Sequence, residues 1–179
     1  MKIGVVRHFR IPHNRVQMVN GPGFDEWANW YDSTDVKAME VPGAGPEWHH
    51  CYSSDLPRAV FTAKTMFRGS VEVTPLLREV PFTSFLPRKL ILPLILWQAS
   101  SRLGWWLNHG SQLETRTQTK ARIAEFVAKL KLEQHDRNVL VVTHGFFMQW
   151  LQKELAIAGF RGNVPTRPIG GTIYYFESF

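Results

Sequence analysis

The chain has 179 residues, of which 44% are hydrophobic and 20% are charged, a balance typical of one compact globular domain and not of a disordered chain. Lys and Arg outnumber Asp and Glu by 21 to 15, and the formal charge of +6 favours anionic partners, with phosphates, nucleic acid and acidic lipid all left open. The single cysteine, Cys51, excludes an internal disulfide and a Cys-rich zinc site, and it predicts a reducing, cytoplasmic location.

Neither the N-terminus nor the most apolar stretch predicts export or membrane insertion. The apolar run at residues 3–6 is shorter than the ~7–15 residues of a signal-peptide core. Residues 90–97 are interrupted by Pro93 and fall below the ~18 apolar residues that indicate a membrane helix. We therefore expect no membrane-spanning segment.

The first predicted element is a buried strand that ends in two charged or titratable side chains. The apolar residues 3–6 predict this strand, which delivers Arg7 and His8 at its carboxyl end. Residues 14–46 are rich in Gly, Pro, Asn and Asp and are predicted to be mostly loop, with a short helix around residues 25–31.

A second strand and a helix are predicted next. Residues 50–53 favour a strand, and Ser54 or Asp55 is suited to cap the helix that follows. Pro57 falls in its first turn, where proline is tolerated. The apolar face of this helix has helical spacing and consists of Leu56, Ala59, Val60, Ala63 and Phe67.

The remaining elements continue an alternation of strands and helices. Strands are predicted at residues 71–73, 139–142 and 172–176, and the longest helix at residues 112–133. Its apolar stripe is Ile123, Phe126, Val127 and Leu130. The strand at 139–142 ends in Thr143 and His144, and Gly145 opens a further helix whose apolar face contains Phe147, Trp150, Leu151 and Leu155. This alternation predicts an α/β fold with a mainly parallel sheet.

Two of these strands end in histidine, and an α/β sheet brings such strand ends together. Arg7 and His8 follow the first strand, and His144 follows the strand at 139–142. Ligands bind at the carboxyl ends of parallel strands, and Arg58 lies in the first turn of a helix, where backbone N–H groups favour an anion. Two guanidinium groups and two imidazoles suit a phosphoryl group in charge and geometry.

Three blocks of the sequence resemble the signature motifs of the histidine phosphatase superfamily, also called phosphoglycerate mutase-like. They are Val5-Val6-Arg7-His8, residues 52–59 with Thr62-Ala63, and Val141-Val142-Thr143-His144-Gly145. The resemblance implies a three-layer α/β/α sandwich with a mainly parallel central sheet and a small apolar cap insertion. We therefore expect a single domain over residues 1–179, with the cap at about residues 80–110.

The resemblance also implies a role for individual residues. His8 is expected to be the nucleophile that forms a phosphohistidine, with Arg7, Arg58 and His144 holding the phosphoryl oxygens. Asn14 has the spacing from His8 of a family asparagine that contacts phosphate. Glu79 is the expected proton donor, with Glu72 or a residue of the segment 21–31 as substitutes. No metal or other cofactor is expected, because the seven histidines show no metal-ligand spacing.

The chain departs from the family pattern beside the expected nucleophile and in the cap. Phe9, Arg10 and Ile11 stand where the family usually has Gly, then Glu or Gln, then Ser or Thr. Phe9 requires an ordinary backbone conformation or a strained one, and the sequence leaves open whether these changes reduce or redirect activity. The apolar side chains of residues 80–110 complete the core, line a pocket for a hydrophobic leaving group, or form a homodimer contact.

The leading functional prediction is a metal-independent phosphatase that hydrolyses a phosphomonoester through a phosphohistidine on His8, with a small phosphorylated compound as its partner. The alternatives are a phosphoglycerate mutase-type phosphotransferase, a protein phosphohistidine phosphatase, and a catalytically weak module that binds a phosphate ligand. No specific nucleic-acid binding is expected, because the basic residues are scattered and no recognition motif accompanies them.

Overall fold

The computed structural model describes residues 1–12, 16–37, 47–133 and 137–178, which fall into two compact units. The first, called here the sheet unit, comprises Met1–Arg10, Asp35–Glu79 and Arg122–Phe179. The second, called the helical unit, comprises Ile11–Thr34 and Val80–Ala121. The predicted cap insertion at about residues 80–110 lies within the helical unit, which also takes in the segment that begins at Ile11.

The sheet unit is built on a six-stranded sheet in the order β4-β3-β6-β1-β8-β7. Its strands are β1 (Lys2–Arg7), β3 (His50–Ser54), β4 (Val71–Thr74), β6 (Val139–Thr143), β7 (Phe160–Gly162) and β8 (Ile173–Ser178). Strands β4, β3, β6 and β1 are parallel, while β8 pairs antiparallel with both β1 and β7. The predicted α/β class with a mostly parallel sheet is confirmed.

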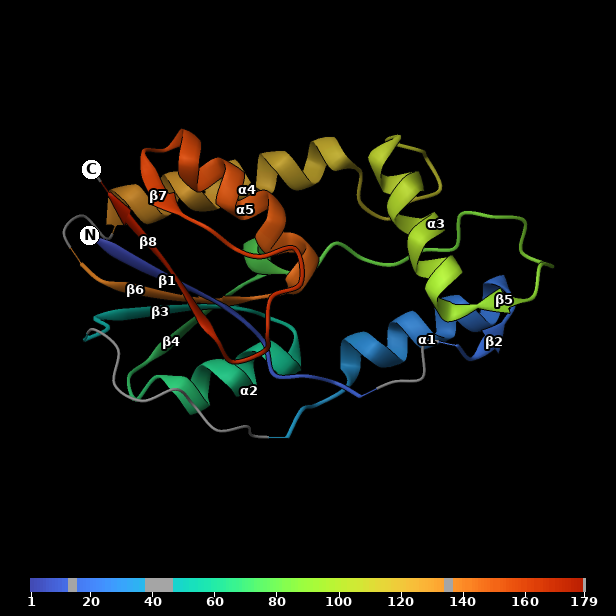
Figure 1. Cartoon of the computed structure of the whole chain (residues 1–179), viewed down its shortest axis with the longest axis horizontal. Helices are drawn as coiled ribbons and strands as arrows, with labels where there is room; N and C mark the ends of the chain where they lie inside the picture. The colour runs from blue at the N-terminus through green and yellow to red at the C-terminus, as the bar shows by residue number, and fades with distance from the viewer. Residues whose placement is uncertain (13–15, 38–46, 134–136, 179) are drawn as a thin grey trace. The chain divides into compact units, whose positions relative to one another are not determined.

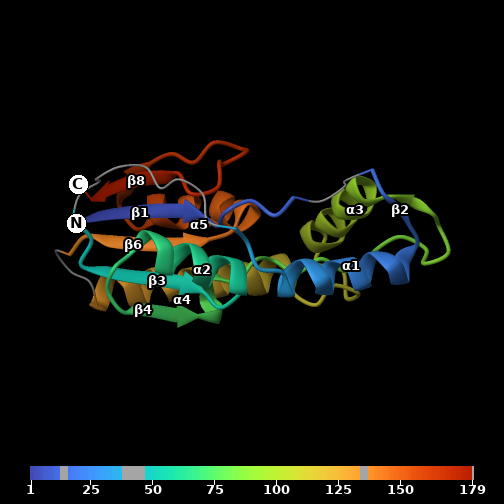
Figure 2. The same ribbon diagram turned by 90° about the horizontal axis from the view of Figure 1, so that it is seen from below.

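Helices cover both faces of this sheet and complete three layers. Helix α2 (Pro57–Met66) lies on one face, while α5 (Gly145–Ile157) and α4 (Arg116–Glu133), of which the part from Arg122 belongs to the sheet unit, lie on the other (Figures 1 and 2). The short 3₁₀ helix η1 (Pro75–Leu77) follows β4. The layers follow from strands that are apolar on both sides, since such strands must be covered twice.

The alternation of side chains along the strands assigns them to two separate cores. Ile3 and Val5 of β1 pack with Val139 and Val141 of β6 toward α4 and α5. Their neighbours Val6, Leu140 and Val142 pack with Ala59 and Ala63 of α2 on the opposite face. Successive strand residues point to opposite faces, and a one-residue slip of β1 against β6 would exchange the two sets. The double burial therefore fixes the register of the central strands.

The helical unit has an aromatic core of its own. It contains α1 (Gly21–Ser33), α3 (Leu94–Trp106), the first turns of α4, and the two-stranded pairing of β2 (Met18–Val19) with β5 (Leu92–Pro93). The Phe24 ring stacks on those of Trp27 and Trp97 with centroids 5.8 and 5.7 Å apart. The Asp25 carboxylate accepts hydrogen bonds from the backbone N–H and the hydroxyl of Ser84 at 2.8 and 3.0 Å, which ties α1 to the segment before α3.

Several local predictions differ from the structure. Helix α1 is longer than the predicted 25–31, α4 begins at Arg116 and not at 112, and helix α3 and strand β7 were not predicted. The prediction that Ser54 or Asp55 is the N-cap of α2 is wrong. The N-cap is Leu56 without a side-chain bond, because the Asp55 carboxylate pairs with Arg78 and the Ser54 hydroxyl contacts His144.

The apolar side chains predicted for residues 80–110 have mixed roles. Leu94, Trp97 and Trp105 are buried, and the Trp105 indole donates to the Thr119 hydroxyl at 2.9 Å, which makes them core residues of the helical unit. A larger set remains exposed, namely Leu90, Ile91, Ile95, Leu96, Leu103, Trp106 and Leu107. Among the helices of the described residues, none combines the length and the hydropathy needed to cross a bilayer.

Replacing Phe126 by Ala tests the core between the sheet and α4. The Phe126 ring is fully buried and meets the Tyr52 ring edge-on, with centroids 5.5 Å apart. We expect the substitution to lower the free energy of unfolding by about 3–5 kcal/mol, measured by urea denaturation. The matched control on the same helix is Leu132→Ala, whose side chain is 84% exposed and whose loss should cost less than about 0.5 kcal/mol. Equal losses in the two variants would contradict the assigned core.

Candidate active site

The candidate site lies at the carboxyl ends of the central strands of the sheet unit. The register of β1 against β6 sets Arg7 opposite Thr143, and the His8 N–H continues the ladder by donating to the Thr143 carbonyl at 2.9 Å. The residues that follow these strand ends, His8 and His144, are therefore neighbours, with ring centroids 5.0 Å apart. Both are buried, His8 at 2% exposure and His144 at 0%.

Two arginines reach this pair of imidazoles from different elements. Arg58 is the second residue of α2, which starts just after β3 ends, and its long side chain is fully buried. The Arg7 guanidinium donates from Nη1 to the Pro168 carbonyl at 3.0 Å. It also lies over the start of α5, where a Cβ on Gly145 would stand 3.1 Å from Arg7 Nε, so glycine leaves room for it. The site is accordingly cationic.

Burial and positive charge keep both imidazoles neutral. Burial lowers the pKa of His8 from 6.5 to about 3, assisted by the charges of Arg58 and Arg7. Burial also holds the pKa of His144 well below its ordinary value, with further contributions from His8 and Arg58. Loss of the charged form is the response expected of a histidine that is removed from water beside cations. Both rings are thus available as neutral bases or nucleophiles at pH 7.

The hydrogen bond made by His8 fixes which of its nitrogens carries the proton. His8 Nδ1 lies 2.6 Å from the Phe9 carbonyl oxygen, and a carbonyl oxygen only accepts hydrogen bonds. Nδ1 must therefore be the N–H donor in the neutral ring, and Nε2 carries the lone pair. Nε2 is thus the nitrogen of His8 that is available to act as a base or a nucleophile.

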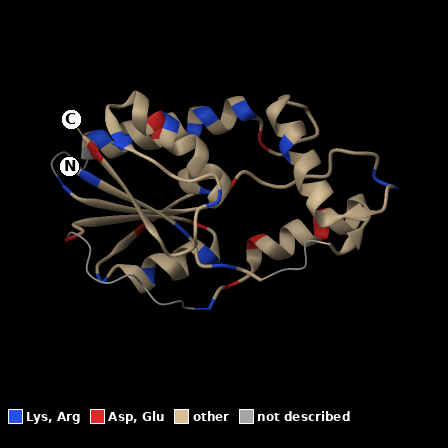
Figure 3. Ribbon diagram, viewed as in Figure 1, with Lys and Arg blue, Asp and Glu red and all other residues tan. Residues whose placement is uncertain are grey.

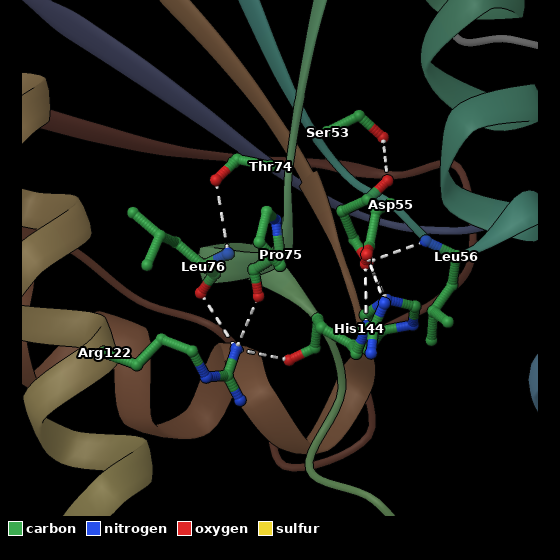
Figure 4. A network of polar contacts seen from close by, with 10 residues as sticks. Ser53, Asp55, Leu56, Thr74, Pro75, Leu76, Arg122 and His144 are labelled. Atoms are coloured by element: carbon green, nitrogen blue, oxygen red, sulfur yellow. Dashed lines mark hydrogen bonds and ion pairs between the residues drawn. The ribbon is translucent and has the colours of Figure 1, made fainter.

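His144 is oriented by a serine at the end of β3. His144 Nε2 lies 2.8 Å from the Ser54 hydroxyl, which also accepts the Leu56 N–H at 3.3 Å (Figure 4). Nδ1 of His144 is buried and meets no polar partner in the described part of the chain, and the same holds for Nε of Arg7. Buried polar atoms without partners are uncommon, and these two belong to side chains of one cationic site. In the tautomer in which Nε2 accepts from the Ser54 hydroxyl, Nδ1 of His144 is a donor like Nε of Arg7, and an oxyanion fits this pair of donors.

Glu79 lies beside His144, at the start of α5. Its carboxylate oxygens accept the backbone N–H groups of Phe146 and Phe147 at 3.3 and 3.1 Å. These are first-turn N–H groups that have no partner within the helix, and the His144 N-cap supplies no side-chain bond to them. The Glu79 carboxylate thus caps the first turn of α5, the helix that begins directly after His144.

Arg122 secures the chain that leads into Glu79. Its Nη1 donates to the carbonyls of Pro75 at 3.3 Å, Leu76 at 2.9 Å and Arg78 at 2.8 Å, and Figure 4 shows the guanidinium facing these oxygens. The guanidinium also lies over the Phe147 ring, 4.9 Å from its centroid. One side chain of α4 therefore holds both η1 and the start of α5, the two elements that Glu79 joins.

Four of the predicted site residues, Arg7, His8, Arg58 and His144, are thus brought together, and Glu79 lies next to them. Asn14 lies outside the described residues. Glu72, the predicted substitute for Glu79, is in the middle of the β3–β4 pairing opposite Tyr52, and its carboxylate pairs with His50 and Lys129.

Sequence reasoning missed two residues of the site. The sequence predicts Ser54 as a helix cap, whereas it is the last residue of β3, and its place at a strand end close to those of His8 and His144 is the available signal. Arg122 had no signal, because nothing in an amphipathic helix identifies an arginine that will bind carbonyls of another segment.

Within the described ranges, no three His, Cys, Asp or Glu side chains are grouped as metal ligands. Lys and Arg occur on strands, helices and loops alike (Figure 3).

Comparison with known proteins finds similarity to one family model and to several solved structures. Residues 41–162 match the model of the histidine phosphatase superfamily (branch 1). A phosphoserine phosphatase from Entamoeba histolytica has a similar structure, with a TM-score of 0.55 and 13% identity over 96% of this chain and 95% of that one. The alpha-ribazole phosphatase of Shigella flexneri gives a TM-score of 0.54 and 17% identity, covering 96% of each chain.

A mycobacterial glucosyl-3-phosphoglycerate phosphatase is also similar, with a TM-score of 0.52 and 21% identity over 86% of this chain and 81% of that one. At these identities the likeness shows a shared fold. A comparison with curated proteins finds no match.

The lowered pKa values of the two histidines predict how stability depends on pH. In the unfolded chain His8 binds a proton below about pH 6.5, whereas in the native state it stays neutral down to about pH 3. The native state therefore loses stability as the pH falls through this range. Between pH 6 and 5 we expect the His8→Gln variant to lose stability less steeply than the wild type, by about 1 kcal/mol per pH unit. The measurement is urea denaturation across this range, with the exposed His109→Gln as control. Parallel pH profiles for wild type and His8→Gln would refute the buried neutral state.

Proposed function

The chain belongs to the histidine phosphatase superfamily, and we propose that it is a phosphatase that transfers the phosphoryl group of a phosphomonoester first to His8 and then to water. The observation that carries this proposal is the His8 ring itself. It is neutral, its Nδ1 proton is held by the Phe9 carbonyl, and its Nε2 lone pair lies in a site with two arginines. Phosphoryl transfer depends mainly on such positioning and charge stabilisation.

In the first step, His8 Nε2 attacks phosphorus, the N–P bond forms and the bond from phosphorus to the ester oxygen breaks. Arg7, Arg58 and His144 bind the non-bridging oxygens, and their N–H groups stabilise the charge that spreads over these oxygens in the transition state. The buried Nε of Arg7 and Nδ1 of His144, which meet no polar partner among the described residues, support this assignment.

Glu79 is the proposed proton donor. In its acid form the Glu79 carboxyl transfers a proton to the departing oxygen, which leaves as an alcohol. In the second step the resulting carboxylate accepts a proton from water as the water oxygen attacks phosphorus, the N–P bond breaks and inorganic phosphate forms. The attachment of Glu79 to the first turn of α5, beside His144, supports this role.

The altered residue after His8 is compatible with this chemistry. Phe9 stands where the family usually has glycine, yet among the described residues other than glycine only Asn108 has a positive φ. Phe9 therefore adopts an ordinary backbone conformation, and its carbonyl still holds the His8 proton. This geometry favours a functional nucleophile over a module that binds phosphate without turnover.

The substrate is proposed to be a small phosphomonoester. The structural neighbours include phosphatases named for phosphoserine, for glucosyl-3-phosphoglycerate and for alpha-ribazole, whose organic groups differ widely. A test panel therefore spans amino-acid, sugar-acid and nucleoside-like phosphates together with an aryl phosphate. Measuring phosphate release against phosphoryl transfer to an acceptor alcohol separates the proposed hydrolase from a mutase.

Replacing the nucleophile tests the mechanism directly. We expect His8→Asn to lower phosphate release on the panel by at least about 10³-fold, because no other side chain replaces the covalent step. Brief incubation with ³²P-labelled substrate should label the wild type and not this variant. The label on a phosphohistidine is stable in base and is lost in acid, which identifies it. His109→Asn, at an exposed histidine, is the control and should retain both activity and label. A His8→Asn variant with unchanged turnover would refute the mechanism.

The proposed role of Glu79 predicts a dependence on the leaving group. We expect Glu79→Gln to lower kcat for an alkyl phosphate by about 10²–10⁴-fold, while an aryl phosphate with an acidic phenol suffers less because its oxygen needs no proton. Vanadate binding should stay near the wild-type value, since Glu79 does not hold the phosphoryl oxygens. Glu125→Gln, at an exposed position on α4, is the control. Equal losses on both esters would assign the acid to another group.

A further inference from the structure

The Phe9 carbonyl contacts the His8 ring, and the Phe9 N–H is bound by one side chain of α2. We propose that Thr62 is a positioning residue for the nucleophile: through the backbone of Phe9 it keeps His8 in the tautomer with its proton on Nδ1 and its lone pair on Nε2. The catalytic consequence rests on the proposed phosphatase function, whereas the tautomer itself does not.

The hydrogen bonds of Thr62 have a definite direction. Thr62 lies one helical turn after Arg58 and is fully buried. Its hydroxyl lies 2.7 Å from the Arg58 carbonyl, which only accepts, so the hydroxyl proton is committed to that oxygen. The Thr62 oxygen is then the acceptor for the Phe9 N–H, at 3.0 Å. Because Thr62 uses both its donor and its acceptor, it links the helix that carries Arg58 to the loop that carries His8.

The Phe9 side chain and the glycines at 170 and 171 hold the same loop from the other directions. The Phe9 ring is fully buried and meets the Phe61 ring edge-on, with centroids 6.4 Å apart. A Cβ on Gly171 would lie 2.8 Å from Cε1 of Phe9, and a Cβ on Gly170 would lie 2.7 Å from the His8 carbonyl oxygen. The Gly171 N–H donates to the Arg7 carbonyl at 2.8 Å. These two glycines let the chain run directly against residues 7–9.

The consequence for His8 follows from the geometry of the Phe9 carbonyl. Nδ1 of His8 and this oxygen are 2.6 Å apart, and they belong to adjacent residues of one loop. If the Phe9 N–H lost its acceptor, a buried donor would be left unsatisfied and the loop would move to find another partner. The carbonyl would then turn away from Nδ1, and the proton would be free to occupy Nε2, which abolishes the lone pair that attacks phosphorus.

The arrangement also explains how phenylalanine replaces the usual glycine. The large side chain fills the space between Phe61 and Gly171 and adds a hydrophobic anchor to the loop. Thr62 then needs only to fix the N–H of Phe9. Loss of a single hydroxyl at position 62 is therefore expected to act on the His8 proton and not on the binding of phosphoryl oxygens by the arginines.

Thr62→Val and Thr62→Ser form the decisive pair, because valine keeps the shape of threonine and serine keeps its hydroxyl. The first measurement is ¹⁵N NMR of the histidine rings without any substrate, which distinguishes an Nδ1–H ring from an Nε2–H ring. We expect His8 of the wild type and of Thr62→Ser to be the Nδ1–H tautomer, and Thr62→Val to show a mixture. With a phosphate ester, kcat of Thr62→Val should fall by about 10- to 100-fold with KM little changed, and Thr62→Ser should recover most of the loss.

Two results would overturn the proposal: an Nε2–H ring in the wild type, or a Thr62→Val variant that keeps both the tautomer and kcat. If Thr62→Val does not fold, hydrogen exchange of the wild-type Phe9 amide decides the question, since the bond to Thr62 predicts slow exchange and rapid exchange would refute it. A wild-type protein with the predicted tautomer and no turnover on any ester would instead count against the phosphatase function, and would leave the positioning role of Thr62 supported.

Discussion

The in-register parallel pairing of β1 with β6 is the constraint on which the site depends. It sets Arg7 against Thr143, and the bond from the His8 N–H to the Thr143 carbonyl extends the ladder by one residue beyond the strand. The two histidines therefore meet because two strands end at the same level. Burial of both faces of these strands enforces the register, since a slip by one residue would send apolar side chains into the wrong layer.

The two histidines are buried beside two arginines, and these surroundings affect both the stability of the native state in acid and the binding of anions. A cationic, dry environment is unfavourable for imidazolium, so His8 and His144 stay neutral and the native state becomes sensitive to acid. The same environment suits a dianionic ligand, because two guanidinium groups attract negative charge more strongly in a buried site than in water. Stability at low pH is thus reduced, while at neutral pH an uncharged imidazole is kept next to positive charge.

Much of the site is held by backbone groups and by side chains that do not touch the reacting atoms. The Phe9 carbonyl sets the His8 tautomer, Ser54 orients His144, and Arg122 binds three carbonyls before Glu79. The contacts of Ser54 and Arg122 each join a segment at the carboxyl edge of the sheet to a helix or strand of the sheet unit. The segments at this edge of the sheet thereby acquire the rigidity of the elements that they contact.

The sequence by itself determined the α/β class, the strands that deliver Arg7, His8 and His144, and the family, because apolar runs followed by charged residues are local patterns. It did not determine the helix of residues 94–106 or the contacts of Ser54, Thr62 and Arg122. A hydroxyl that caps a helix and one that orients a histidine look identical in a linear pattern, and an arginine that binds distant carbonyls carries no local mark. Only tertiary structure decides such contacts, because their partners come from segments far apart in the chain.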